Sequence, residues 1–292
     1  MIYSSVQKKF LDISKDIVNL YYKSMYDNKI QSIYRASRIL SLYSFDKPRF
    51  GISEISRALN LHKGTVQGLV RTLTAEGFLQ QDPETRKYEL GFKIYELGVI
   101  LAGTLEINQK AVHHAQQLAK KTQHLVRIGI LDKSSVLVTM DATPEPQPFL
   151  SPQLGPRAPL YCTAMGKAIL AFLEQHEIDA YLGGVELLPY TMNTMTEKEQ
   201  LLEELRETRR RGYSINREEH LLLRAAIGAP IFGRKSRLVG SMCLVGDPSY
   251  LFGKRMERIV KEVVKTAVQI SQLMGCFQMP VYSSGGKITF QG

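Results

Sequence analysis

The segment spanning residues 30–90 constrains the fold more than any other part of the chain. Its apolar residues recur at spacings of three and four in three short stretches, as they do in helices that bury one face. Two runs that favour β-strands follow, separated by a turn that contains Pro83. The predicted helices are residues 30–45, 51–59 and 63–77, and the predicted strands are residues 78–81 and 87–90. Three helices followed by a hairpin predict a winged helix-turn-helix domain.

The third predicted helix has the composition of an element that reads DNA. Its inner face is aliphatic, whereas its other faces carry basic and polar side chains and no acidic residue before Glu76. One helix fits the major groove of B-form DNA, where Arg, Lys, Gln and Thr side chains reach base edges. We expect Ser53 to cap the preceding helix, and the tip of the hairpin to contact a flanking phosphate or the minor groove. The predicted DNA-binding residues are Ser53, Lys63, Gly64, Thr65, Gln67, Gly68, Arg71 and Thr72, with Arg86 and Lys87 at the hairpin tip.

The charge distribution agrees with an anionic partner. The chain has 38 Lys and Arg residues against 28 Asp and Glu residues, a formal net charge of +10. Seven basic and two acidic residues lie between positions 31 and 75, so the excess in the first domain is local. Charge alone is more typical of a solvated helix face. The DNA-binding prediction therefore depends on the combination of this charge with the helix-turn-helix pattern.

The length of the chain favours two domains with helical segments at their borders. Residues 1–28 contain one amphipathic stripe, which predicts an N-terminal helical arm. Residues 92–106 are too apolar for a free linker, so we predict a connecting helix that buries one face against a second copy of the chain. The predicted division is an arm at 1–28, the winged helix-turn-helix domain at 29–91, the connecting helix at 92–106, a second domain at 107–278 and a flexible tail at 279–292.

Beyond the connecting helix, strand-like and helix-like segments alternate, which predicts an α+β domain. A proline-rich stretch, residues 144–159, is expected to be a loop. The helices of this domain are predicted at residues 108–122, 163–173, 197–212 and 252–274, and its strands at residues 124–131, 135–141, 225–232 and 238–245.

The cysteines and the apolar runs restrict the class of protein. Cys162, Cys243 and Cys276 lie far apart in the sequence, which argues against a disulfide framework or a zinc cluster. No apolar run reaches the roughly 18 residues of a membrane span, and the N-terminus lacks the apolar core of a signal peptide. These features predict a cytoplasmic protein with no membrane partner, no bound metal and no cofactor.

Several motifs of the chain resemble the IclR family of bacterial transcription regulators, over residues 30–275. The helix-turn-helix alone is weakly specific, but its combination with motifs of the second domain, in order and at family spacing, is strong. The matching segments are residues 51–55, 77–85, 88–91, 155–171, 211–213, 218–220, 227–232 and 239–241. The resemblance implies an α+β protein in which a helix joins the DNA-binding domain to a GAF-like effector-binding domain with an antiparallel sheet. It also implies homodimers that often pair into tetramers, and operator binding that a small organic or aromatic acid changes. Repression is the commoner outcome in the family.

The resemblance also implies where such an effector binds. Residues 163–167 are predicted to begin a helix, and free N–H groups at a helix start can hold a carboxylate. Asn216 departs from the family, because some members have an acidic residue there, and a neutral amide matches different ligand groups. The implied effector-binding residues are Leu150, Ala158, Thr163, Ala164, Met165, Gly166, Asn216, Ala226, Cys243 and Val245.

Two alternatives come from other classes of protein. In the first, the regulator senses a metal or an oxidant through Cys162, Cys243, His113 or His114. In the second, which is less favoured, the second domain is a thiol-dependent enzyme. A lone intracellular cysteine is more often a buried apolar residue, and adjacent histidines on a helix point in different directions. The sequence pairs neither Cys162 nor Cys243 with a base or an orienting group, so we predict that the protein is not an enzyme.

Overall fold

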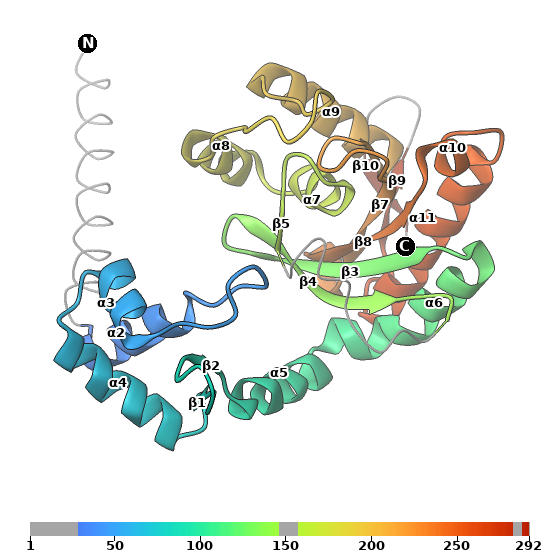
Figure 1. Cartoon of the computed structure of the whole chain (residues 1–292). Coiled ribbons are helices and arrows are strands. Elements are labelled where there is room, and N and C mark those ends of the chain that lie inside the picture. Colours follow the sequence, from blue (N-terminus) through green and yellow to red (C-terminus); the bar gives the residue numbers. More distant parts are fainter. Residues whose placement is uncertain (1–28, 146–156, 283–287, 292) are drawn as a thin grey trace, which may run out of the picture. The chain divides into compact units, whose positions relative to one another are not determined.

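A computed structural model describes residues 29–145, 157–282 and 288–291 of the chain (Figure 1). The predicted N-terminal arm, residues 1–28, lies outside the described residues. The chain forms two compact units that divide between Val99 and Ile100. This division falls inside helix α5 (Phe92–Thr104), which occupies the place of the predicted connecting helix.

Residues 29–91 of the first unit form three helices and a two-stranded antiparallel hairpin, in the order that the sequence predicts. The helices and the first strand share one apolar core, which includes Ile39, Ile55, Val70 and Leu79. The first helix ends at Leu40, earlier than predicted. The elements are α2 (Gln31–Leu40), α3 (Ile52–Leu59), α4 (Lys63–Ala75), β1 (Leu79–Gln81) and β2 (Tyr88–Leu90).

The start of α3 corrects the prediction that Ser53 caps this helix. The helix begins at Ile52, with Gly51 at the capping position and Ser53 exposed in the first turn. The Glu54 carboxylate accepts a hydrogen bond from the Gly51 N–H group at 2.7 Å. Because a carboxylate at this position reaches back to satisfy a free N–H group, the helix begins without a hydroxyl cap.

Helix α5 forms where the sequence predicts it, and none of its residues is buried. A helix that is apolar on most sides is normally covered by other parts of a protein. The described residues of the chain do not cover α5, so its packing against a second copy stays a prediction. The large apolar side chains along it, each at least 44% exposed, are Phe92, Tyr95, Leu97, Val99, Ile100 and Leu101.

The second unit is built on a six-stranded antiparallel sheet with the strand order β5-β4-β3-β8-β7-β6. Strand β7 lies inside this sheet, and all of its residues are buried. Its near-continuous apolar sequence is typical of a strand that is covered on both faces. The strands are β3 (Leu125–Asp132), β4 (Ser135–Ala142), β5 (Arg157–Pro159), β6 (Ser214–Arg217), β7 (Ala225–Phe232) and β8 (Leu238–Gly246).

Helices cover both faces of this sheet, so the second unit has two apolar cores (Figure 1). On one face, α6 (Glu106–Thr122) and α11 (Met256–Leu273) pack against the strands through residues such as Ala111 and Val263. On the other face lie α7 (Ala164–Leu170), α8 (Gln175–Gly184) and α9 (Lys198–Arg211). The alternation of helices and strands predicted from the sequence is confirmed.

Several elements of the second unit differ from the prediction. Strand β5 occupies the end of the proline-rich stretch that was expected to be a loop, and α8 and β6 were not predicted. The predicted closing helix, residues 252–274, begins later than expected, as α11 from Met256, and a separate short helix, α10 (Pro248–Leu251), precedes it.

The expected flexible tail, residues 279–292, is also corrected. Strands β9 (Met279–Tyr282) and β10 (Ile288–Gln291) pair antiparallel within it. Both segments contain residue types that favour strands, such as Val281 and Ile288, and the glycine- and serine-rich run between them masked this pattern in the sequence.

Candidate functional site

Helix α4 has one buried face and one exposed face, as a helix that binds in the major groove must. Val66, Val70 and Leu73 are buried in the core of the first unit. The ring Nδ1 of His62 accepts a hydrogen bond from the Gly64 N–H group at 3.2 Å and so caps the helix start. The predicted DNA-binding residues of this helix lie away from the core: Lys63, Gly64, Gln67, Arg71 and Thr72 are exposed, and Thr65 and Gly68 are half-buried.

The exposed face of α4 keeps its positive charge. The ion pairs of the described first unit involve Lys47, Arg49, Lys87 and Lys93, and neither Lys63 nor Arg71 takes part in one. No acidic residue lies within the helix, which ends before Glu76. Both charges are therefore available to an anionic partner.

The two cations predicted at the hairpin tip have different surroundings. Arg86 is exposed, and its backbone has a φ of 56°, in the left-handed region that a tight turn requires. Lys87 is half-buried, and its ammonium lies 3.3 Å from the Glu54 carboxylate of α3. Since Glu54 partly neutralises Lys87, Arg86 is the stronger candidate for a phosphate contact.

Eight of the ten predicted effector-binding residues line one cavity of the second unit, on the face of the sheet that α7 covers. Strand register brings them together: Cys243 of β8 lies opposite Arg127 of β3, and Val245 lies opposite Ala226 of β7. Ala226 in turn pairs with Asn216 of β6. The predicted residues that line this cavity are Ala158, Thr163, Ala164, Met165, Asn216, Ala226, Cys243 and Val245.

Two predicted residues are not part of this lining. Leu150 lies outside the described residues. Gly166 faces the chain that precedes α7, where a Cβ atom would come within 2.2 Å of the Leu160 carbonyl oxygen. Gly166 thus permits close packing of α7 and does not line the cavity. Five lining residues were not predicted from the sequence: Arg127, His220, Leu221, Arg224 and Ala225.

The start of α7 holds fewer free N–H groups than the sequence predicts. The Thr163 hydroxyl accepts a hydrogen bond from the Gly166 N–H group at 3.1 Å and donates one to the Pro159 carbonyl at 2.6 Å. The Lys167 N–H group bonds to the Thr163 carbonyl at 2.9 Å. The N–H groups of Ala164 and Met165 belong to the first turn, where no intrahelical acceptor exists.

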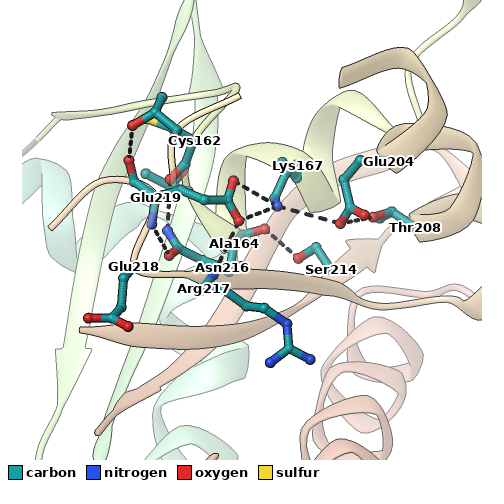
Figure 2. Close-up of polar contacts among 12 residues, drawn as sticks. Cys162, Ala164, Lys167, Glu204, Thr208, Ser214, Asn216, Arg217, Glu218 and Glu219 are labelled. Atoms are coloured by element: carbon teal, nitrogen blue, oxygen red, sulfur yellow. Dashed lines mark hydrogen bonds and ion pairs between the residues drawn. The ribbon is translucent and has the colours of Figure 1, made fainter. Parts of the chain in front are cut away.

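A buried polar network lies behind Asn216 (Figure 2). The Asn216 amide donates to the Cys162 carbonyl at 2.7 Å and accepts from the Glu219 N–H group at 3.1 Å. The Lys167 ammonium, in a residue that is 1% exposed, donates to both oxygens of the Glu219 carboxylate at 2.7 and 2.9 Å. It also lies 3.4 Å from the Glu204 carboxylate of α9. These contacts fix the orientation of the Asn216 amide and connect the cavity wall to α9.

The charges around the cavity favour an anionic ligand. Among the described residues that line it, two are arginines and none is a carboxylate. Arg127 is buried and pairs with Asp141 at 2.9 Å, while Arg224 is exposed. Burial lowers the pKa of His220, so its ring is neutral at pH 7. The rest of the lining is largely apolar, as in most small-molecule sites.

The buried cysteines lack the properties of reactive thiols. Burial raises the pKa of both Cys162 and Cys243 to about 12, so both are neutral thiols at pH 7. His113 forms a hydrogen bond with the Gln117 side chain at 2.9 Å. In the part of the chain that the structure describes, no three His, Cys, Asp or Glu residues are grouped to hold a metal ion.

Comparison with known proteins matches both units. Residues 32–83 match the model of the IclR helix-turn-helix domain, and residues 101–272 match the model of the C-terminal domain of the bacterial transcriptional regulator IclR. The chain belongs to the IclR family. It is therefore a transcriptional regulator with a DNA-binding helix-turn-helix domain and a C-terminal effector-binding domain.

Other IclR-family proteins align with most of the chain. The HTH-type transcriptional regulator XynR of Escherichia coli is 28% identical over 246 residues, which cover 84% of this chain and 98% of XynR. The crystal structure of an IclR transcriptional regulator from Alicyclobacillus acidocaldarius has a TM-score of 0.74 at 26% identity and covers 85% of this chain and 100% of that one. An IclR homologue from Microbacterium hydrocarbonoxydans, crystallised with 4-hydroxybenzoate, shares the fold with a TM-score of 0.72 at 20% identity, over 84% of this chain and 99% of that one.

None of the helices described in this IclR-family chain is both long enough and apolar enough to span a membrane.

Proposed function

We propose that this IclR-family regulator is a repressor whose operator affinity changes when a small organic or aromatic acid binds in the cavity beside α7. One observation carries the proposal: eight residues implied by the family resemblance line a single cavity, together with two arginines and no described carboxylate. The homologue crystallised with 4-hydroxybenzoate shares this fold, which supports an aromatic acid as one ligand class. A repressor of chromosomal genes acts in the cytoplasm.

On the DNA side, α4 enters the major groove and the hairpin tip contacts the backbone. Helix α4 supports this role because its exposed face is basic and polar and its opposite face is buried. Arg86 contacts a phosphate, with a smaller contribution from Lys87, whose charge Glu54 partly neutralises. Ser53 contributes from the exposed first turn of α3. The regulator binds as a homodimer, or as two paired dimers, so its operator is a near-palindrome.

Replacing Arg71 by alanine tests the DNA-reading role of α4. If Arg71 contacts a guanine, the variant loses about 1–3 kcal/mol of operator binding and discriminates less at one base pair. Fluorescence anisotropy measures this with an operator selected from random DNA and with its single-base variants. Arg206→Ala, an exposed arginine on α9, is the control and is expected to leave binding unchanged. If Arg71→Ala lowers the affinity for every DNA sequence equally, Arg71 contacts a phosphate and not a base.

A further inference from the structure

The strand register aligns an ion pair and a cysteine across three strands at the floor of the cavity. Asp141 of β4 lies opposite Arg127 of β3, which lies opposite Cys243 of β8. Because neighbours across a sheet share one face, all three side chains lie on the face that α7 covers. Arg127 and Cys243 both line the cavity. The sheet thus presents a guanidinium to this space from below.

Arg127 has unused hydrogen-bonding capacity although it is buried. The residue is 4% exposed, and among the described residues its guanidinium forms one hydrogen bond, from a terminal nitrogen to Asp141 at 2.9 Å. A guanidinium has five N–H groups. The buried Nε of Arg127 has no hydrogen-bond partner in the described structure, and neither has the buried Oδ1 of Asp141, but only Arg127 lines the cavity. Buried polar groups are nearly always paired, so this donor indicates a ligand group that the cavity receives.

The remaining polar groups of the lining define the chemistry of that ligand group. The Asn216 amide is held by Cys162 and Glu219 and cannot turn to follow a ligand. Asp141 offsets the charge of Arg127, and Arg224 adds a second positive charge to the lining. An ionised carboxylate only accepts hydrogen bonds, so it suits the donors of Arg127, whereas a hydroxyl or an amide would also bring a donor.

We propose that Arg127 is the residue that selects ionised carboxylates in the cavity. The ligand carboxylate lies against the sheet at Arg127, and its apolar body lies toward Met165, Ala226 and Val245. Asp141 positions the guanidinium and does not contact the ligand. This inference rests on the proposed function of the cavity and deepens it, because it assigns the acid selectivity to a residue of β3.

The test compares acids with their amides on the full-length protein. Calorimetric titrations use acetate, butyrate, benzoate and phenylacetate, each beside its neutral primary amide. The variants are Arg127→Lys, which keeps the charge but removes the guanidinium donors, and the double variant Arg127→Gln/Asp141→Asn, which removes both charges of the buried pair. The matched control is Arg157→Lys, an exposed arginine that pairs with Asp132 on the same sheet, outside the cavity lining.

We expect at least one carboxylate to bind the wild-type protein at least tenfold more tightly than its amide. Arg127→Lys should lower the affinity for that carboxylate at least tenfold. The double variant should bind the acid and its amide with equal affinity, and Arg157→Lys should bind both as the wild-type protein does. If Arg127→Lys fails to fold, the double variant decides. The inference is overturned if no carboxylate binds the wild-type protein, or if the preference for acid over amide survives in the double variant.

Operator binding, measured in the same samples, separates this inference from the proposed function. An acid that changes operator affinity equally in wild type and in the folded Arg127 variants contradicts the role of Arg127 but supports the proposed function. An acid that binds through Arg127 and leaves operator affinity unchanged supports the role of Arg127 and contradicts the proposed function.

Discussion

Replacing Lys167 by methionine is expected to lower the free energy of unfolding by about 3–5 kcal/mol, because it leaves a buried carboxylate without its cation. The Glu219 side chain is 7% exposed, and Lys167 donates to both of its oxygens. Methionine fills a similar volume, so the loss reflects the charge and not a cavity. Urea denaturation of the full chain, monitored by circular dichroism, measures the change.

Two further variants isolate the cause of this loss. The double variant Lys167→Met/Glu219→Gln should recover at least half of the lost stability, since replacing both partners of a buried ion pair costs much less than removing one. Arg206→Met, which breaks an exposed ion pair with Glu203 on α9, should change stability by less than about 1 kcal/mol. A Lys167→Met variant within about 1 kcal/mol of wild type would show that the network in Figure 2 contributes little.

Placing a charge on α5 is expected to have the second large effect. Ile100 is 61% exposed on a helix without buried residues, so we expect a second copy of the chain to cover it. Ile100→Glu should convert the proposed dimer into monomers and lower operator affinity by about 10²-fold or more, because two linked recognition helices bind with an avidity that one lacks. Analytical ultracentrifugation reports the mass, and anisotropy with the selected operator reports the affinity.

The control for this variant is Met192→Glu, a 92% exposed apolar residue outside α5. It should leave both the mass and the operator affinity unchanged. A monomeric Ile100→Glu protein with full operator affinity would contradict the role of the dimer in DNA binding. A dimer that persists in Ile100→Glu would show that the copies meet elsewhere.

The DNA-binding unit could be predicted well from the sequence because its signals are local. Spacings of three and four mark α4, and a turn between two short strand-like runs marks the hairpin. The cap of α3 was predicted incorrectly, because the carboxylate of Glu54 satisfies the Gly51 N–H group and Ser53 does not. A cap by Ser53 and one by Glu54 both use a side chain near the helix start, and only the three-dimensional geometry shows which of them forms.

Some residues of the cavity could be predicted from the sequence. Those that could not are the ones whose positions depend on long-range contacts. Residues implied by the family resemblance include the apolar walls and Asn216, but not Arg127, His220 or Arg224. Arg127 lies in a predicted strand, yet its burial follows from pairing with Asp141 on the next strand. Lys167 meets a carboxylate that is 52 positions away in the sequence, and no local pattern marks such a pair.

In the proposed function, an acid bound in the second unit controls DNA binding by the first. The most direct measurement is the operator affinity of the full-length wild-type protein, by fluorescence anisotropy, with and without saturating small carboxylic acids. We predict that at least one acid changes the dissociation constant at least fivefold, and that operator DNA changes the affinity for that acid by the same factor, as thermodynamic linkage requires. Operator affinity that stays constant while an acid saturates the cavity would contradict the proposed function.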